Sequence, residues 1–272
     1  VLLQRGIDLG SPVADHPLNR DEYLQCWWMP LGNRSRGNSM FDLLGKTNGT
    51  LGSSASWSGN KGQIGISTGA SSSAYIEATS STPFDVAGAC TICLRFYIRS
   101  RPATAACLWS RTAAGSWTTA GRQIEVPSDG VWYWNNFSAG TVTASHTILA
   151  GQEYIIVVTK DSSTNLIFYV NGYQTRAAST GTNPAVNASH VVRLGNKATN
   201  ASINCVFLDH RYYSRQLSAN EVLLLSNEMA SGYPNLLRRT SRRSLLGSTT
   251  GGGGGFQPAW ARGSNVILGA GS

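Results

Sequence analysis

The chain has 272 residues, of which 41% are hydrophobic and only 13% are charged, and its formal net charge is +8. No segment reaches the ~18 apolar residues that a membrane span needs, and the N-terminus lacks the basic and apolar pattern of a secretory signal peptide. We therefore expect no membrane insertion and synthesis in a cytoplasm. The low charge and many small polar residues favour an all-β surface protein over a helical enzyme.

The N-terminal part of the chain predicts an arm followed by strands. Residues 1–21 are polar with scattered apolar positions, which predicts an extended arm. Residues 24–29 form a short apolar run that ends at Pro30, as expected of a first strand. Apolar residues then alternate along 90–98, which predicts a strand with one buried face.

The middle of the chain predicts hairpins. Residues 123–126 and 131–135 flank a Pro-Ser-Asp-Gly turn. Residues 154–159 and 166–170 flank a polar turn, and Asn171-Gly172 then makes a tight turn into a further strand. With segments near 191–194 and 205–213, roughly a dozen short strands are expected.

One helix is predicted near the end of this region. Ser218 and Glu221 have the spacing of a capping box. Val222, Leu225 and Met229 then share one helical face through about residue 230, before Gly and Pro end the helix.

The C-terminal tail has a distinct composition. Residues 229–272 contain five arginines and no acidic residue, so they carry +5 of the +8 net charge. Five consecutive glycines, 251–255, form a flexible linker to an apolar terminus. We predict a partner-binding arm, and its residues are Arg238, Arg239, Arg242, Arg243, Phe256, Trp260, Arg262, Val266, Ile267 and Leu268.

The arginines do not predict nucleic-acid binding. Aromatic residues interleaved with the basic ones would favour that role, and leucines flank the arginine pairs instead. We expect an acidic protein surface as the partner.

The five cysteines predict buried thiols. Their number is odd and their spacing is irregular, unlike a disulfide framework. Cys90 and Cys93 form a C-x-x-C, but residues three apart on a strand point to opposite faces. Zinc would also need two more ligands at a matching spacing.

Two segments resemble a known family. Tyr-Val-Asn-Gly at 169–172 and the run 208–222 are similar to the laminin-G-like, concanavalin A-type jelly roll. The resemblance covers roughly residues 22–230 and implies an all-β, antiparallel two-sheet sandwich with one short helix. The predicted organisation is an N-terminal arm (1–21), the jelly-roll domain (22–230) and a basic, Gly-rich C-terminal arm (231–272).

A second resemblance involves the tail. Residues 231–239 and 259–268 are similar to phage-type members of the family, which are associated with capsids and fibres. This resemblance implies a bacteriophage virion protein.

The residues do not predict catalysis. A glycosidase needs two carboxylates flanking the scissile bond, and the chain has only 14 acidic residues with no E-x-D arrangement. The histidines lack a G-x-S-x-G-like context, and His210 is interpreted as a satisfied strand residue. We expect no enzyme activity and no cofactor.

The sequence offers a few candidate residues for a calcium site and for a glycan site. Only Asp42, Asn48 and Asp209 loosely match a structural Ca²⁺ site. Trp132 and Trp134 share one face of a strand and Tyr133 lies on the other. Exposed rings among these three would stack on sugars, whereas the favoured interpretation assigns one face to the core.

The sequence therefore favours a non-enzymatic virion structural protein, a capsid decoration or cementing subunit made in the host cytoplasm. Its terminal arms would bind other capsid chains or further copies in a symmetric oligomer. The alternative is a carbohydrate-binding lectin or adhesin module, on a tail or head fibre, that binds host-surface glycans.

Overall fold

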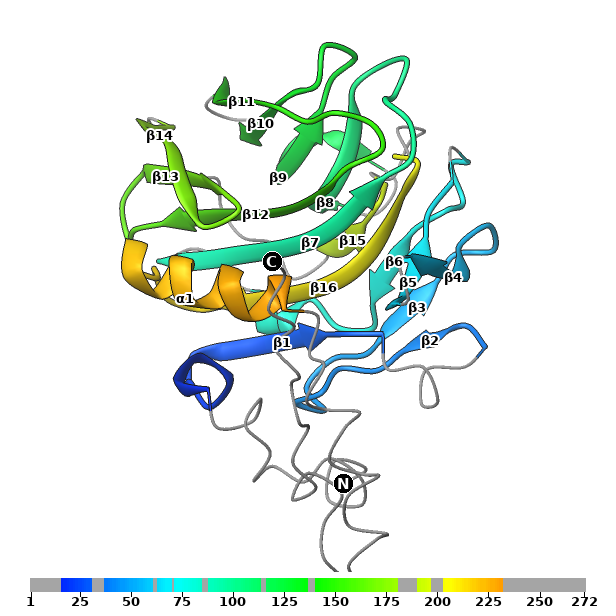
Figure 1. Ribbon diagram of the computed structural model, residues 1–272, viewed down its shortest axis with the longest axis horizontal. Helices are drawn as coiled ribbons and strands as arrows, with labels where there is room; N and C mark the ends of the chain where they lie inside the picture. The colour runs from blue at the N-terminus through cyan, green and yellow to red at the C-terminus, as the bar shows by residue number, and fades with distance from the viewer. Residues whose placement is uncertain are drawn as a thin grey trace, which may run out of the picture.

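The chain folds into a sandwich of two β-sheets (Figure 1). The structure is a computed structural model, and it describes residues 16–30, 37–60, 63–69, 71–84, 88–113, 116–136, 140–180, 190–196 and 203–231. Within these residues each sheet has eight strands, and all pairs of neighbouring strands are antiparallel. The predicted all-β, two-sheet jelly roll is confirmed.

The first sheet has the order β14-β13-β12-β7-β16-β5-β4, and β1 also pairs with β16. Neighbours such as β7 and β16 are far apart in sequence, as long jelly-roll connections require. The bounds of its strands are β1 Leu24–Trp28, β4 Ser56–Asn60, β5 Gln63–Ser67, β7 Cys90–Ile98, β12 Glu153–Lys160, β13 Asn165–Val170, β14 Tyr173–Ser179 and β16 Cys205–Tyr213.

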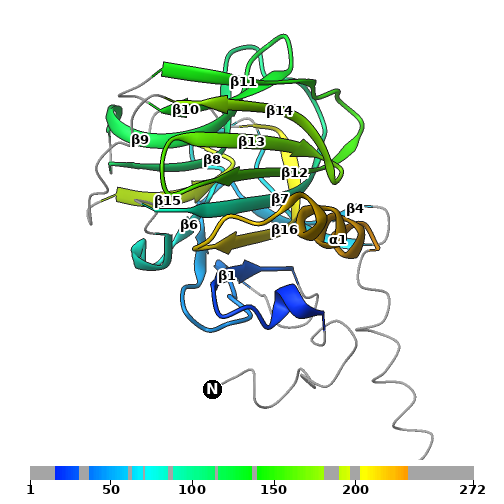
Figure 2. The ribbon, with the colours of Figure 1, turned by 90° about the vertical axis from the view of Figure 1, so that its left-hand side faces the viewer.

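The second sheet has the order β11-β10-β9-β8-β15-β6-β3-β2. The strands β11, β10, β9 and β8 are neighbours in the sheet and also follow one another in the sequence. Figure 2 shows them beside the first sheet. Their bounds are β2 Ser39–Met40, β3 Gly49–Leu51, β6 Ile76–Ala78, β8 Ala106–Ala113, β9 Ser116–Val126, β10 Val131–Asn136, β11 Gly140–Thr147 and β15 His190–Leu194.

The main core lies between the sheets and is rich in aromatic residues. Trp109 and Trp134 stack with ring centroids 6.4 Å apart, and Trp132 meets Phe168 edge-on at 5.4 Å. All four side chains are at most 1% exposed. Such rings each bury a large apolar area and dominate the energetics of a core.

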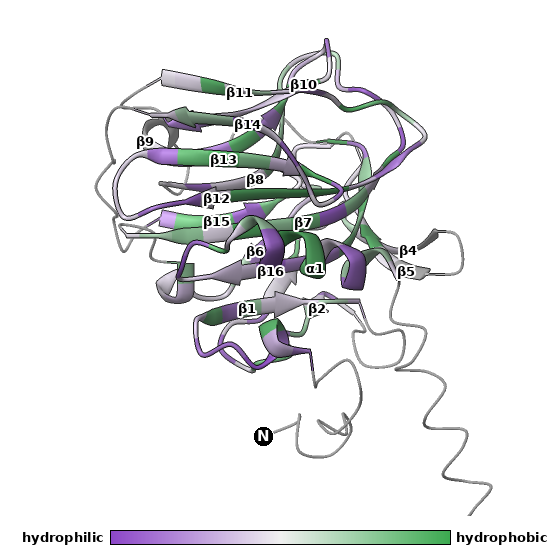
Figure 3. Cartoon of the chain, turned by 60° about the vertical axis from the view of Figure 1, so that its left-hand side comes forward, coloured by the Kyte–Doolittle hydropathy of each residue, from purple (hydrophilic) through white to green (hydrophobic). Residues whose placement is uncertain are grey.

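A second apolar cluster lies on the outer face of the first sheet. The helix α1 (Ala219–Ala230) and the short 3-10 helix η2 (Pro17–Asn19) cover this face, and Figure 3 shows α1 lying against it. Val222, Leu225 and Met229 of α1 are completely buried there. Ser218 and Glu221 form the predicted capping box.

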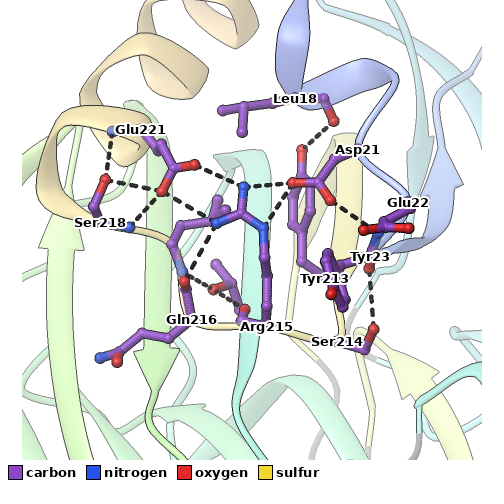
Figure 4. A network of polar contacts seen from close by, with 12 residues as sticks. Leu18, Asp21, Glu22, Tyr23, Tyr213, Ser214, Arg215, Gln216, Ser218 and Glu221 are labelled. Atoms are coloured by element: carbon purple, nitrogen blue, oxygen red, sulfur yellow. Dashed lines mark hydrogen bonds and ion pairs between the residues drawn. The ribbon is translucent and has the colours of Figure 1, made fainter.

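The body begins earlier than predicted, because residues 16–21 pack against it. Leu18 is buried in the second cluster, and Figure 4 shows Arg215 between Asp21 and Glu221. Arg215 Nε lies 2.7 Å from Asp21 Oδ2, and its Nη2 lies 2.6 Å from Glu221 Oε1. This network joins the N-terminal segment to the start of α1, so the described body includes six residues assigned to the N-terminal arm.

Local chemistry explains the turns and the thiols. Asn171 and Gly172 both have positive φ, 52° and 87°, as a two-residue hairpin turn requires. All five cysteines are free and buried. Cys90 lies in the main core and Cys93 in the second cluster, so the two point to opposite faces as expected. Among the described residues no helix is long and apolar enough to cross a membrane.

Candidate functional site

The outer face of the second sheet is the broad face that no helix covers in the described part of the chain (Figure 2). The corresponding face of the first sheet is occupied by α1 and η2. Parts of this face are covered by other segments, because Ser110 and Gln123 are 0% exposed, while Tyr133, Asn135, Arg193 and Glu77 are half-buried. A ligand would therefore contact the half-buried residues first and reach the buried ones only after the covering segments move.

Strand pairing places a row of polar residues across this face. Directly paired residues on neighbouring strands share a face, and the pairs here run through β10, β9, β8, β15 and β6. The row consists of Asn135, Gln123, Ser110, Arg193 and Glu77. With strands ~4.8 Å apart, the row spans roughly 19 Å. We call it the polar row.

Tyr133 and Glu125 lie next to the polar row on the same face. The Tyr133 hydroxyl donates to Glu125 Oε2 at 2.7 Å, and Asn135 Nδ2 donates to Glu125 Oε1 at 3.4 Å. Burial, reinforced by the neighbouring Glu125 carboxylate, raises the pKa of the Tyr133 phenol well above its usual value. The phenol therefore remains a hydrogen-bond donor at neutral pH.

The guanidinium group of Arg193, toward the other end of the row, has a fixed orientation. Its Nε lies 2.5 Å from Glu77 Oε2, and its guanidinium carbon lies 4.2 Å from the centre of the Tyr75 ring. An ion pair combined with a cation–π contact fixes the plane of the guanidinium. The polar row thus presents planar groups in defined orientations.

Gln123, between Asn135 and Ser110 in the row, has an unusual environment. It is completely buried, yet neither its Oε1 nor its Nε2 has a hydrogen-bond partner among the described residues. A buried polar group without a partner costs about 1–3 kcal/mol. Such a group in a native structure calls for an explanation, and a ligand that supplies the missing partner is one.

Of the three aromatic residues predicted as glycan contacts, only Tyr133 lies on this face. Trp132 and Trp134 are at most 1% exposed in the main core, which corrects their assignment as possible contacts. The reason is the strand period of two, because alternate residues of β10 face the first sheet. The structure therefore shows that one face of β10 belongs to the core, as the favoured interpretation of the sequence predicted.

The sequence predictions missed the polar row. Gln123 and Glu125 alternate with the apolar Ile124 and Val126, and this pattern marks a strand with a polar outer face. The signal was present, but the register that joins it to Arg193 and Glu77 depends on strands far apart in the chain.

The calcium candidates do not form one site. Both carboxylate oxygens of Asp42 accept backbone N–H groups, Oδ1 from Trp27 and Leu44 and Oδ2 from Lys46 and Thr47. Asn48 Oδ1 accepts the Asp42 N–H. Burial nevertheless raises the pKa of Asp42, against the effect of these bonds. Asp42 and Asn48 therefore organise a loop.

Asp209 lies elsewhere, beneath α1. Its Oδ2 is 3.2 Å from Arg211 Nη2, and burial raises its pKa to about 6 despite that pairing. No group of three or more His, Cys, Asp or Glu side chains that could hold a metal occurs in the described ranges.

His210 is a core residue. It is 1% exposed and stacks on Phe84, and its Nδ1 is 3.0 Å from the Cys93 carbonyl oxygen. Burial lowers its pKa to about 4, so the ring is neutral at pH 7.

The residues predicted for partner binding lie outside the described residues. They are Arg238, Arg239, Arg242, Arg243, Phe256, Trp260, Arg262, Val266, Ile267 and Leu268.

Residues 67–223, more than half of the chain, match the family model described as the concanavalin A-like lectin/glucanases superfamily. The chain belongs to this superfamily. The matched region includes the whole polar row, from Glu77 to Arg193. No curated protein matches the chain.

Solved structures share the fold of this superfamily member at low sequence identity. Trypanosoma rangeli sialidase is 14% identical with a TM-score of 0.62, over 78% of this chain and 34% of the sialidase. The binding domain of Paraclostridial Mosquitocidal Protein 1 is 16% identical with a TM-score of 0.61, over 76% of this chain and 52% of that domain. The botulinum neurotoxin serotype G binding domain is 14% identical with a TM-score of 0.59, over 76% and 51%.

The chain thus spans about a third of the sialidase and about half of each toxin domain. At these identities the likeness concerns the fold alone. The phage resemblance predicted from the tail has no counterpart among these structures.

Proposed function

We propose that the protein is a non-enzymatic carbohydrate-binding module that holds a glycan on the outer face of its second sheet. The observation that carries the proposal is the polar row, in which the buried amide of Gln123 lies between Asn135 and Ser110 and has no hydrogen-bond partner among the described residues. This function is the alternative predicted from the sequence, and the lectin/glucanases family match supports it better than the virion role.

The chemistry of the row suits sugar hydroxyls. Each hydroxyl both donates and accepts a hydrogen bond, and the amides of Gln123 and Asn135 offer both functions in one plane. Tyr133 adds a partly exposed aromatic ring next to them. Ligand sites typically combine aromatic surface with a few placed polar groups in this way.

The carboxylate spacing supports binding without hydrolysis. Glu125 on β9 and Glu77 on β6 are the carboxylates that strand pairing assigns to this face, and they are three strand steps apart. The three strand steps and the two-residue offset of Glu125 from the polar row together give roughly 16 Å. Most glycosidases place their two carboxyl groups about 5–9.5 Å apart, and sialidases, which use a tyrosine nucleophile, are an exception. The spacing therefore argues against the two-carboxylate mechanism.

The test is binding of the full chain to a broad panel of immobilised glycans, with and without Ca²⁺. We expect saturable binding of at least one glycan class, and a loss of about tenfold or more in affinity for Tyr133→Ala and Asn135→Ala. Tyr23→Ala is the matched control, because this exposed tyrosine lies away from the second sheet. Absence of binding to every glycan would overturn the proposal.

A virion role is the second candidate, and one observation favours it. Residues 229–272 combine five arginines, no acidic residue and an apolar terminus, a composition that fits an arm bound to a partner chain. In this candidate the protein is a capsid decoration subunit made in the host cytoplasm, and its arms bind other capsid chains or further copies. Deletion of residues 248–272 should then abolish incorporation into particles, and normal incorporation would exclude this role.

A further inference from the structure

A β-bulge in the edge strand β14 changes the direction of Arg176. Gln174 pairs with Tyr169 and Arg176 pairs with Phe168, so Thr175 is an extra residue on β14. Without the bulge, Thr175 would pair with Phe168, and the alternation of side chains would place Arg176 on the face that α1 covers. With the bulge, Arg176 shares the inner face of the sheet with Phe168, which lies in the main core. Bulges that redirect a side chain in this way are common next to functional sites.

Arg176 reaches the second sheet at its edge strand β11. Figure 2 shows β11 and β14 next to each other, although they belong to different sheets. The Arg176 Nη1 group donates to Thr143 Oγ1 at 2.5 Å and to the Thr143 carbonyl oxygen at 3.1 Å. Thr143 pairs directly with Tyr133, so their side chains share the outer face and have Cβ atoms about 5 Å apart. Arg176 therefore lies at the edge of the proposed glycan site, beside Tyr133.

The charge of Arg176 has no acidic partner in the described part of the chain. Arg193, at the other end of the polar row, differs because it pairs with Glu77. Both hydrogen bonds of Arg176 use Nη1 and end on neutral oxygen atoms. They orient the exposed guanidinium and leave Nε and Nη2 for a ligand. These two groups form one edge of the planar fork that binds an oxyanion with two parallel hydrogen bonds.

We propose that Arg176 binds an acidic group of the glycan, a carboxylate or a sulfate, and that the protein therefore prefers acidic glycans. This inference rests on the proposed function and names its ligand class. Tyr133 and Asn135 would contact the neighbouring sugar, and Arg176 would hold the acidic group at the edge of the sheet. The contact uses only the side chain of Arg176, so the backbone amides of β14 need not be protected when the glycan binds.

The test is a comparison of glycans that differ by one acidic group. Lactose, cellotetraose and chitotetraose are each immobilised in three forms: unmodified, with one added carboxylate and with one added sulfate. The full chain should bind at least one acidic form about fivefold more tightly than its unmodified parent, which is the upper end for an exposed ion pair. The carboxylate and sulfate forms show which acidic group the site takes.

Variants assign the preference to Arg176. Arg176→Gln should abolish the difference between acidic and unmodified forms. Arg99→Gln is the matched control, because Arg99 is also exposed and donates to two hydroxyl groups, those of Ser67 and Ser58. These serines lie on β5 and β4, at the opposite edge of the first sheet from β14. Arg99→Gln removes the same charge and should keep the preference.

A variant at Thr143 tests the orientation of the guanidinium. Thr143→Val removes one of the two anchoring oxygens and leaves the net charge unchanged. It should reduce the preference by a smaller factor than Arg176→Gln. All three positions are exposed, so the fold should persist, and far-UV circular dichroism verifies it.

The possible failures are distinguishable. Equal binding of acidic and unmodified forms would overturn this inference and leave the proposed function standing. A preference that persists in Arg176→Gln would also overturn it, and would assign the preference to other cationic residues, such as the five arginines of 229–272. Absence of binding to every form, and to the broad glycan panel, would overturn the proposed function and this inference with it.

Discussion

Replacing Gln123 with leucine should stabilise the unliganded protein and weaken glycan binding. Gln123 is completely buried and both its amide atoms lack hydrogen-bond partners among the described residues. Leucine has a similar volume and no polar atoms, so the substitution removes the unsatisfied group without leaving a large cavity. A gain in stability with a loss of affinity is the trade-off expected at a binding site that stores unfavourable free energy.

The size of the expected stabilisation follows from the cost of leaving the Gln123 amide unsatisfied. An unsatisfied buried polar group costs about 1–3 kcal/mol, so we expect a gain of about 2 kcal/mol in the free energy of unfolding. With a urea m-value of about 3 kcal/mol per M, the unfolding midpoint should rise by about 0.7 M. Loss of the hydrogen bonds to a sugar should weaken binding by about 1–3 kcal/mol, which corresponds to roughly 5- to 150-fold.

The assay is urea unfolding followed by fluorescence, with glycan titrations on the same samples. Asn135→Leu is the control, because its amide already donates to Glu125 and its loss should weaken binding without raising the midpoint. A lower midpoint for Gln123→Leu would refute the reasoning, since it would mean that the amide is hydrogen-bonded in the unliganded protein.

Further substitutions and conditions test the remaining claims. Asp42→Ala removes an acceptor for four backbone N–H groups. It should lower the free energy of unfolding, measured with urea, by about 3 kcal/mol. EDTA should leave the unfolding midpoint of the wild-type protein unchanged, and a lower midpoint would show a bound metal. Trp134→Ala should cost about 3–5 kcal/mol of stability, because the ring is 1% exposed, and an unchanged midpoint would argue against its place in the core. The Arg215 side chain lowers the pKa of Glu221 to about 2, so this carboxylate contributes stability that is present above about pH 4.5 and is lost as the pH falls toward 2. Glu221→Gln should therefore flatten the acid limb of the stability curve, and an unchanged acid limb would contradict the ion pair.

Much of the fold could be predicted because it depends on local patterns. The hairpin at Asn171-Gly172 and the capping box at Ser218 each lie within a few residues of sequence. The edge strand β11 was not predicted, because its small polar residues are mostly exposed and show little alternation of burial. The docking of residues 16–21 was missed for another reason, since it depends on the ion pair between Asp21 and Arg215, far along the chain.

The candidate site could be predicted only in part. Alternation in 122–126 and 131–135 separates the core tryptophans from Tyr133, but it does not bring Arg193 next to Ser110. That contact comes from the pairing of β15 with β8, two strands about 80 residues apart. Asp42 is a case in which the sequence pattern was misleading. It resembles a ligand of a cation site, but its carboxylate accepts hydrogen bonds from backbone N–H groups of its own loop.

Hydrogen–deuterium exchange with a glycan identified on the panel tests the central claim most directly, because it locates the bound sugar on the full chain. We predict slower exchange in β8, β9 and β10 on glycan addition, with no change in α1 or β14. Protection confined to α1, β14 or the first sheet would contradict a site on the outer face of the second sheet.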